Sequence, residues 1–390
     1  MIEFQKFVDF VRDTYQVPSE FIPLHPPYFH GNEKKYLNEC IDSTFVSSVG
    51  EFVTQFEKMI AGYTGAKYAI AASNGTAALH MALILANVKP KDEVISQALT
   101  FVATANAISY VNATPLFIDV DKDTMGMSPS ALKHFLENNT TFDIHPHTGK
   151  KQPKNISTGN FITTCVPMHT FGHPVRIDEI KSICDTYNIT LIEDAAESLG
   201  SYYKGQHTGT FGEIGTFSFN GNKTITTGGG GMLITNSEEI AKKAKHLTTT
   251  AKVPHKWNYI HDMVGYNYRL TNLAAALGVA QMEQLEGILH RKRDLASKYS
   301  TFFSSNDLEF VTQKADSEAN YWLNAVICKD KKNQQSFLEF TNAQGIMTRP
   351  IWQLMSRLEM FKNAPKGDLS NSEWLADRVV NIPSGIVNNI

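Results

Sequence analysis

Short apolar runs alternate with longer, helix-like stretches between about residues 66 and 235. The seven runs are KYAIAAS, EVISQ, PLFIDVD, NFITTCVP, ITLIEDAA, GTFSFN and GMLIT, and helical patterns such as TFVATANAISYVN and RIDEIKSICDTYN lie between them. Continuous apolar runs alternating with helices are typical of parallel strands that are buried on both faces. The pattern therefore predicts an α/β fold with a large, mostly parallel sheet covered by helices. Ligands of such sheets bind at the carboxyl ends of the strands, so we expect the chemistry just after each run.

The two ends of the chain follow other patterns. The first segment, MIEFQKFVDFVRDTY, has apolar residues at helical spacing, and its charged residues exclude a signal peptide. We expect this helix to dock on the body of the protein. After about residue 270, LTNLAAALGVAQMEQLEGILHRKRDLASKYSTFF predicts one long helix, and alternating segments such as ANYWLNAVIC follow it. The predicted organisation is an N-terminal helical extension (1–21), a large α/β domain (22–265) and a smaller α+β domain (266–390).

Residues 138–160, NNTTFDIHPHTGKKQPKNISTGN, are polar and rich in turn formers. We expect an exposed excursion there. His145 and His147 are two residues apart, but a flexible loop would supply neither a third ligand nor a rigid scaffold, so no metal is expected.

Composition narrows the class of protein without assigning a function. The chain has 390 residues, 42% of them hydrophobic, and a net charge of −3, so the charge balance points neither to nucleic acid nor to an anionic membrane. No segment has the length and apolar character of a membrane span. Four widely spaced cysteines indicate reduced, buried thiols and a cytoplasmic protein.

The stretch FSFNGNKTITTGGGGM raises the question of what Lys223 does. A phosphate-binding loop would need a glycine directly before the lysine, where this chain has Asn222. A solvated surface lysine is the simplest alternative, but Lys223 follows a predicted buried strand and is flanked by tight-turn residues. The third interpretation is a lysine that forms an imine with an aldehyde, and pyridoxal phosphate supplies such an aldehyde.

Pyridoxal phosphate also needs an acid at its ring nitrogen, a phosphate cradle and a stacking partner. Asp194 ends a predicted strand and can supply the acid, although a helix cap is the alternative; Glu193 should point to the other face. SNGTAALHMAL opens a helix directly after a strand, where free N–H groups attract an anion. Ser218 could add a hydroxyl. Phe101, also beside a strand end, could stack on the ring or belong to the core.

With these features together, the chain resembles the DegT/DnrJ/EryC1/StrS sugar aminotransferases, which are fold type I enzymes that use pyridoxal phosphate. The resemblance covers roughly residues 22 to 385. It rests on SNGTAAL, TFVATANA, PMHTFGHPVRIDEI, IEDAAESLGS, GTFSFNGNKTITTGGGGM, GYNYRLTNLAAALGVAQM and NIPSG. It implies an aspartate aminotransferase-like fold with a large, mostly parallel seven-stranded sheet domain and a smaller α+β C-terminal domain.

The resemblance also implies a role for each matched position. Lys223 would carry the cofactor and shuttle the proton, and Asp194 would pair with the ring nitrogen. The further implied contacts are Gly75, Thr76, Ala77 and Ser218 at the phosphate, Phe101 on the ring face, Glu197 at the ring hydroxyl, and Asn267 at the cofactor phosphate of a neighbouring subunit. The resemblance thus implies a homodimer with shared active sites.

Within the family, PLHPPYFHGNEKKYLNECIDSTFVSSVGEFVTQFE and TRPIWQLM are most similar to enzymes that aminate nucleotide-linked 4-keto-6-deoxy-2-acetamido sugars, as in bacillosamine and legionaminic acid pathways. The implied reaction moves an amino group from L-glutamate to C4 of such a sugar, carried by UDP or GDP. The alternatives are 3-amination of another keto sugar and a regulatory member without catalysis. The family's sugar 3-dehydratases have a histidine in place of the lysine, so Lys223 argues against that activity.

Two further residues have open roles. His169 could face the substrate or be a hydrogen-bonded structural histidine. Arg349 could bind the phosphates of the sugar nucleotide or make a structural salt bridge. Relatives usually continue into a final helix beyond PSG, whereas this sequence stops at Ile390.

Overall fold

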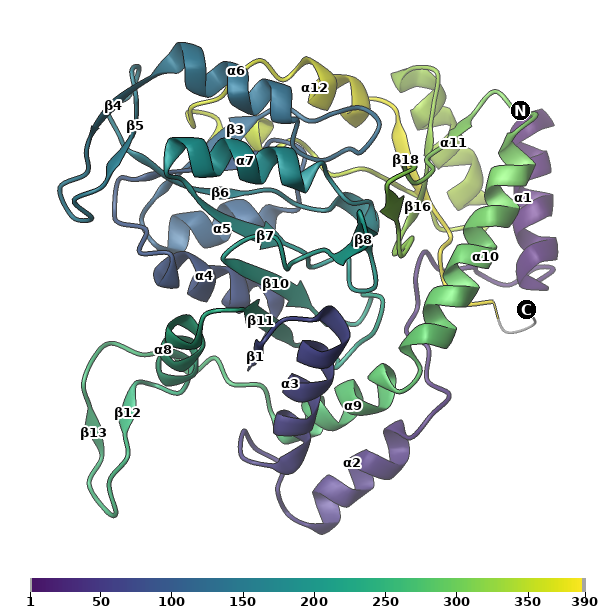
Figure 1. Ribbon diagram of the computed structural model, residues 1–390. Helices are drawn as coiled ribbons and strands as arrows, with labels where there is room; N and C mark the ends of the chain where they lie inside the picture. The colour runs from purple at the N-terminus through teal and green to yellow at the C-terminus, as the bar shows by residue number, and fades with distance from the viewer. Residues whose placement is uncertain (1, 388–390) are drawn as a thin grey trace.

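The computed structural model describes residues 2–387, so the last three residues, with the chain end noted above, lie outside the described part. A seven-stranded sheet forms the centre of the larger part of the molecule, in the order β1-β11-β10-β7-β6-β2-β3 (Figure 1). Only the pairs that involve β11 are antiparallel, and the others are parallel. The strands are β1 (Tyr68–Ala72), β2 (Glu93–Gln97), β3 (Thr114–Ile118), β6 (Ile162–Val166), β7 (Thr190–Asp194), β10 (Ile214–Ser218) and β11 (Gly231–Thr235). The predicted α/β fold and all seven predicted strands are confirmed.

Helices cover both faces of this sheet. One face packs on α4 (Gly75–Leu85), α5 (Val102–Tyr110) and α8 (Glu238–Thr248). The other face packs on α3 (Glu51–Thr64), α6 (Pro129–Asn139), α7 (Ile177–Tyr187) and α9 (Asn272–Met282). Neighbouring residues of a strand go to opposite faces: Leu191 packs on the α7 side and Ile192 on the α4 side. This alternation explains why consecutive strand residues are apolar, since both faces of the sheet are covered.

A second, four-stranded sheet lies beside the large one, in the order β14-β16-β18-β17. Its strands are β14 (Glu309–Phe310), β16 (Asn324–Ile327), β17 (Arg349–Pro350) and β18 (Val379–Ile382). The helices of this region are α10 (Leu285–Phe303), α11 (Lys331–Ala343) and α12 (Ser370–Ala376), with 3-10 turns at Met355–Arg357 and Glu359–Phe361. Short elements elsewhere are α2 (Glu33–Asp42), the 3-10 turn Thr170–Gly172, β8 (Tyr202–Tyr203), β9 (Gln206–His207), β12 (Lys252–Val253), β13 (Ile260–His261) and β15 (Ser317–Glu318).

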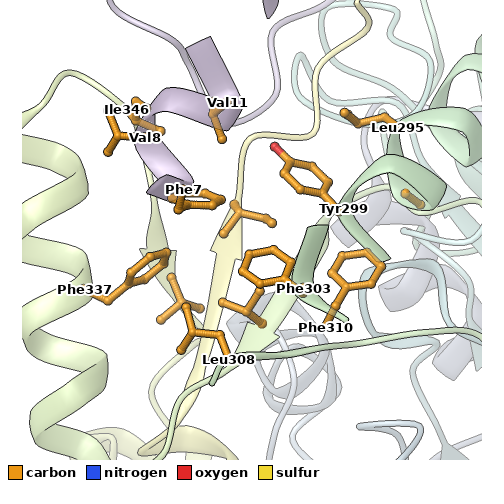
Figure 2. Close-up of a cluster of buried hydrophobic side chains, with 14 of the residues drawn as sticks. Phe7, Val8, Val11, Leu295, Tyr299, Phe303, Leu308, Phe310, Phe337 and Ile346 are labelled. Atoms are coloured by element: carbon orange, nitrogen blue, oxygen red, sulfur yellow. The ribbon is translucent and has the colours of Figure 1, made fainter. Parts of the chain in front are cut away.

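The N-terminal helix α1 (Ile2–Tyr15) packs into this smaller region, as expected. Its apolar residues Phe7, Val8 and Val11 are buried against α10 and α11 (Figure 2). The ring centroids of Phe7 and Phe337 lie 5.1 Å apart, and Phe7 also contacts Tyr299 and Phe303. The first helix and the C-terminal region therefore share one hydrophobic core. The domain limits at residues 21 and 265 stay a prediction.

The expected excursion at residues 138–160 is instead a β-hairpin of β4 (Thr140–Ile144) and β5 (Lys151–Asn155). It is anchored rather than loose, because His145 is buried and its Nε2 lies 3.0 Å from Asp92 Oδ1. Asn155 is also buried and donates to Glu93. Most of the segment is exposed, as predicted, but it forms a hairpin rather than an irregular loop, and some of its polar residues make partnered contacts at the amino end of β2.

The single long helix predicted after residue 270 is wrong, because α9 and α10 are separate helices that meet at Glu283 and Gln284. No glycine or proline marks the break. Gln281 and Gln284 both donate to the buried carboxylate of Glu33, and these bonds hold the junction against the start of α2. Tertiary contacts thus bend a helical pattern that the sequence alone shows as continuous.

No helix in the described range is both long and apolar enough to cross a membrane. The four cysteines are buried free thiols, as expected.

Candidate active site

A cavity of about 610 Å³ lies at the carboxyl ends of the parallel strands and is also lined by residues of the small sheet. Its walls combine segments from both regions. The lining residues include Asn74, Gly75, Thr76, Phe101, Thr104, Asp194, Ala196, Glu197, Ser218, Asn222, Lys223, Trp322, Arg349, Trp352 and Asn381. The cavity thus lies where the strand pattern predicts the chemistry.

Lys223 projects into this cavity from the turn that follows β10. Its Nζ lies 3.2 Å from Glu197 Oε1 and 4.0 Å from the ring centre of Trp322. The side chain is 12% exposed. A solvated surface lysine would have no such enclosure, so the geometry favours a lysine that works inside the cavity.

Asp194 and Glu193 end β7 and point to opposite sides, as the strand alternation predicts. Asp194 is buried and lines the cavity; its Oδ2 accepts a hydrogen bond of 2.7 Å from Thr104 Oγ1, and its Oδ1 accepts from Ala196 N. Burial raises the pKa of this carboxyl by desolvating its charged form, while these bonds oppose the rise. A turn rather than a helix follows Asp194, so it is not a helix cap.

Glu193 has a structural environment instead. Its carboxylate accepts hydrogen bonds from the backbone N–H groups of Gly209, Phe211 and Gly212. It also lies 3.0 Å from His169 Nε2.

Glu197 supplies a second carboxylate to the cavity. Its Oε2 accepts from the backbone N–H of Phe171, and its Oε1 faces Lys223. Desolvation raises the pKa of Glu197 to about 7, although the nearby lysine opposes this shift. The carboxyl group can therefore gain or lose a proton near neutral pH.

The start of α4 forms an anion cradle. Asn74 caps the helix, because its Oδ1 accepts from Ala77 N at 2.8 Å. The first N–H groups of a helix have no intrahelical acceptor and attract anions. Gly75 is required there: an added Cβ would lie 2.7 Å from Ser218 Cβ. Ser218 and Thr76 line the same corner. Ala77, by contrast, is buried in α4 outside the lining residues, and its N–H is taken by the cap, so direct phosphate contact through Ala77 is not supported.

Aromatic side chains form the remaining walls. Phe101 is 47% exposed and lines the cavity from the residue before α5, so it is not a core residue. Trp352 lies across from it at 6.1 Å between ring centroids. The indole N–H of Trp322 donates to the backbone oxygen of Asn222 at 2.5 Å. These rings bound a slot that fits a flat heterocycle.

Two polar residues face the cavity from paired strands of the small sheet. Arg349 of β17 lies opposite Asn381 of β18 in the strand register. In the described part of the chain Arg349 has no carboxylate within 4 Å; its Nη1 donates to Asn342 Oδ1 and Thr348 O. Asn381 is 3% exposed, and its Nδ2 has no hydrogen-bond partner. An unbonded buried amide in a cavity wall needs a partner, and a ligand can supply one.

The structure does not bring His169 and Asn267 into the cavity. His169 is fully buried; its Nε2 meets Glu193 and its Nδ1 accepts from Val175 N. Of the two roles considered for His169, its contacts therefore favour the hydrogen-bonded structural one. Asn267 is exposed and forms an isolated bridge with Thr249. Its predicted role at a neighbouring subunit stays a prediction.

Residues 2–387 contain no group of three or more His, Cys, Asp or Glu side chains placed to hold a metal ion.

Several residues that line the cavity were not predicted from the sequence. Thr104 lies within the segment TFVATANA, but its partner Asp194 is 90 residues away in the chain. Trp322, Trp352 and Asn381 belong to the small domain, whose alternating pattern gives no indication of which face meets the cavity. A motif search could have found Thr104; the other three needed the tertiary structure.

The cavity fits pyridoxal phosphate on its own chemistry. Phosphate can bind at the N–H groups that open α4. The carboxylate of Asp194 can pair with the ring nitrogen, and the amine of Lys223 is enclosed in the same cavity. Close packing of Gly75 against Ser218 leaves no room for a side chain at residue 75, so an anion can approach the backbone there.

Comparison with known proteins agrees with this reading. The family model described as the DegT/DnrJ/EryC1/StrS aminotransferase family matches residues 27–386. A GDP-perosamine synthase of Escherichia coli O157:H7 is 37% identical over 94% of this chain and 93% of its own length. The GDP-perosamine synthase of Vibrio cholerae is 34% identical over 93% of this chain and 94% of its own length.

Solved structures share the fold. The Helicobacter pylori aminotransferase PseC superposes with a TM-score of 0.84 at 20% identity, covering 95% of both chains. TlmJ of Streptoalloteichus hindustanus gives a TM-score of 0.83 at 23% identity, with 93% of each chain covered. From its sequence match, the chain belongs to the DegT/DnrJ/EryC1/StrS family and is a pyridoxal phosphate-dependent sugar aminotransferase.

Proposed function

We propose that Lys223 carries the cofactor and moves the proton during amino transfer. The observation that carries this proposal is the enclosed amine of Lys223, 3.2 Å from Glu197 in the cavity that Asp194 also lines. A lysine held beside the reacting carbon can act as general base and then as general acid, an effect worth about 10²–10⁴-fold in rate.

The other polar residues would hold the cofactor. When bound, pyridoxal phosphate withdraws electrons from the carbon that loses its proton. Asp194 would keep the ring nitrogen protonated, and this positive charge would offset the desolvation that raises the pKa of the carboxyl. Glu197 would bond the ring hydroxyl. Gly75, Thr76 and Ser218 would surround the phosphate, with Phe101 on the ring face.

We further propose L-glutamate as donor and C4 of a nucleotide-linked 4-keto-6-deoxy-N-acetylhexosamine as the aminated position. Two relatives named GDP-perosamine synthase support 4-amination and give weight to GDP as the carrier. The acetamido group, and a pathway such as that of legionaminic acid or bacillosamine, rest on the sequence resemblance described above.

Arg349 and Asn381 are proposed to bind the acceptor. A guanidinium without a carboxylate partner can bind a diphosphate, and the unbonded amide of Asn381 can bond a polar group of the sugar. Such contacts away from the reacting carbon would orient the ketone, and orientation can supply several kcal/mol of the barrier reduction.

The substrate proposal is tested with a panel of keto sugars and glutamate, followed by mass spectrometry. The panel contains UDP- and GDP-linked 4-keto-6-deoxy-N-acetylglucosamine, a GDP-linked 4-keto sugar without the acetamido group, and a 3-keto sugar nucleotide. Amination of an N-acetylated 4-keto sugar is expected. If only the GDP sugar without the acetamido group reacts, the proposed amination at C4 stands and the proposed acetamido group is wrong. Reaction of only the 3-keto sugar would overturn the C4 assignment.

The role of Lys223 has a separate test. Borohydride reduction of the loaded protein, followed by peptide mapping, should leave the cofactor on the peptide that contains Lys223. Attachment to a different lysine would overturn this role.

A further inference from the structure

Lys292, in the middle of α10, is a buried cation that the proposed reaction does not use. Its side chain is 1% exposed, and no carboxylate in the described part of the chain lies within 4 Å of its Nζ. Instead, Nζ lies 2.8 Å from Ser384 O, 2.9 Å from His25 Nε2 and 3.1 Å from Trp322 O. An ammonium group has three donors, and three acceptors surround this one.

Burial lowers the pKa of Lys292 to about 7, because it desolvates the charged form of the amine. Burial and the charge of Lys292 lower the pKa of His25 well below its usual range, so its ring is neutral. Lys292 therefore binds two backbone segments and one side chain without an opposing charge.

The three acceptors come from distant parts of the chain. His25 precedes α2, Trp322 follows β15, and Ser384 follows β18. Ser384 is held in turn, since its Oγ accepts from Asn324 N at 2.7 Å and donates to Ile382 O. A lysine on α10 thus connects the small sheet to the segment that carries Trp322.

Trp322 connects this buried site with the cavity. Its backbone oxygen accepts from Lys292, while its indole N–H donates to Asn222 O, the residue before Lys223. The same ring lies 4.0 Å from Lys223 Nζ. The backbone N–H of Trp322 is fixed as well, because it donates to Asn320 Oδ1 at 2.8 Å. Movement of Trp322 would therefore displace both the turn and the amine of Lys223.

We propose that Lys292 is a positioning residue for catalysis, which acts through Trp322 to hold the Lys223 turn and amine in place. This inference rests on the proposed role of Lys223. The amine of Lys292 holds three chain segments together through hydrogen bonds. Trp322, which belongs to one of them, in turn positions the turn that carries Lys223.

The test is a double-mutant cycle on the loaded, full-length protein. Lys292→Met keeps the length of the side chain but removes its donors, and Trp322→Phe removes the indole bond to Asn222. The double variant combines both changes, and Lys298→Met, at an exposed position of the same helix, is the matched control. Rapid mixing with glutamate gives the rate and the half-saturating concentration, and visible circular dichroism reports the setting of the bound cofactor.

We expect Lys292→Met to slow the reaction with glutamate by about tenfold or more, since a misplaced reacting group can cost up to about 10²-fold. Half-saturation should change less than twofold or so, and the dichroism band should weaken. In the Trp322→Phe background the same change should cost little more, because the two residues act in series. Lys298→Met should match the wild type in every measurement.

Three outcomes separate the explanations. Independent, multiplying effects in the double variant, or a Lys292→Met protein with wild-type rate and dichroism, would overturn the positioning role. Failure of the wild type and Lys298→Met to trap the cofactor on Lys223 would instead overturn the proposed function. If Lys292→Met does not fold, Lys292→Gln takes its place in the cycle, with the same two decisive results.

Discussion

Neighbouring carboxylates show how one residue step decides function. Glu193 points into the protein, where three backbone N–H groups and His169 saturate it, while Asp194 enters the cavity. The sequence was sufficient to predict this difference, because side chains of a strand alternate between faces. It was not sufficient to predict that Thr104 would bond Asp194, since that contact depends on how β7 and α5 are placed together.

The first prediction concerns Asp194→Asn. The amide cannot hold a proton on the cofactor ring, and loss of a close negative charge lowers the pKa of the ring nitrogen by about 1–3 units. Both half-reactions should therefore slow by about 10- to 1,000-fold while the protein stays folded. Single-turnover absorbance with each substrate measures the rates, and thermal unfolding checks the fold. Near-normal turnover would show that Asp194 has only a structural role.

The second prediction uses the pKa of Glu197, which burial raises from 4.5 to about 7. The folded state then holds the proton more tightly than the unfolded state. This contribution to stability is complete below about pH 4.5 and is lost as the pH rises to about 7. At 1.36 kcal/mol per pKa unit, the loss is about 3 kcal/mol.

Glu197→Gln cannot ionise, so the cofactor-free variant should gain about 3 kcal/mol over the wild type between pH 4 and 8. Urea unfolding at both pH values measures the difference. Glu318→Gln, at an exposed glutamate, is the control and should show no such gain. An equal pH dependence in wild type and Glu197→Gln would contradict the raised pKa.

At the scale of elements, the N-terminus of α4 has two roles. Asn74 caps the helix, and the same turn faces the proposed phosphate position. Ser237 provides a matched cap, because its Oγ accepts from Ile240 N at the start of α8. Since β11 runs antiparallel to its neighbour β10, Ser237 follows β11 at the end of the strands that is opposite to the cavity.

The third prediction compares these two caps. Asn74→Ala and Ser237→Ala should each destabilise the cofactor-free protein by about 1 kcal/mol. Only Asn74→Ala should also weaken cofactor binding, by about five- to tenfold, which corresponds to about 1 kcal/mol. Thermal unfolding and cofactor titration measure the two effects. Equal cofactor affinity in both variants would argue against a phosphate at α4.

Helices and strands could be predicted from the sequence where the local residue pattern, rather than tertiary contacts, determines them. Strands such as β2 and β7 are buried along almost their whole length and have consecutive apolar residues at their centres, so these short runs identify them. The hairpin of β4 and β5 was missed because its polar residues resemble a loop until His145 meets Asp92. The break between α9 and α10 was missed because side-chain bonds to Glu33, rather than a glycine or proline, cause it.

At the scale of the whole molecule, the hairpin of β12 and β13 leaves large apolar side chains exposed, and the contacts of its aromatic rings, Lys252 on Tyr259 and His255 on Trp257, lie within the hairpin itself. Trp257, Tyr259 and Val264 are 74%, 83% and 82% exposed, and the hairpin projects from the body of the chain (Figure 1). Exposed aromatic groups of this kind mark interaction surfaces. Asn267 lies a few residues beyond the end of β13, so a second copy seated on the hairpin would lie near it. We propose that a second copy of this chain covers this surface.

The last prediction tests the shared site by mixing variants. If each site combines Lys223 of one subunit with Asn267 of the other, Lys223→Ala and Asn267→Ala should each give a poorly active homodimer. In the heterodimer, one site receives both substitutions and the other receives neither. Co-expression with two different tags and isolation of the heterodimer should therefore recover about half the wild-type activity, since one of two sites is intact. Sedimentation would verify the dimer, and the variant with both substitutions in one chain, paired with the wild type, is the control. That pair places one defect in each site, so it should stay poorly active. Full activity in a monomer, or a heterodimer no more active than its parents, would exclude a site built from two subunits and leave the exposed hairpin without this role.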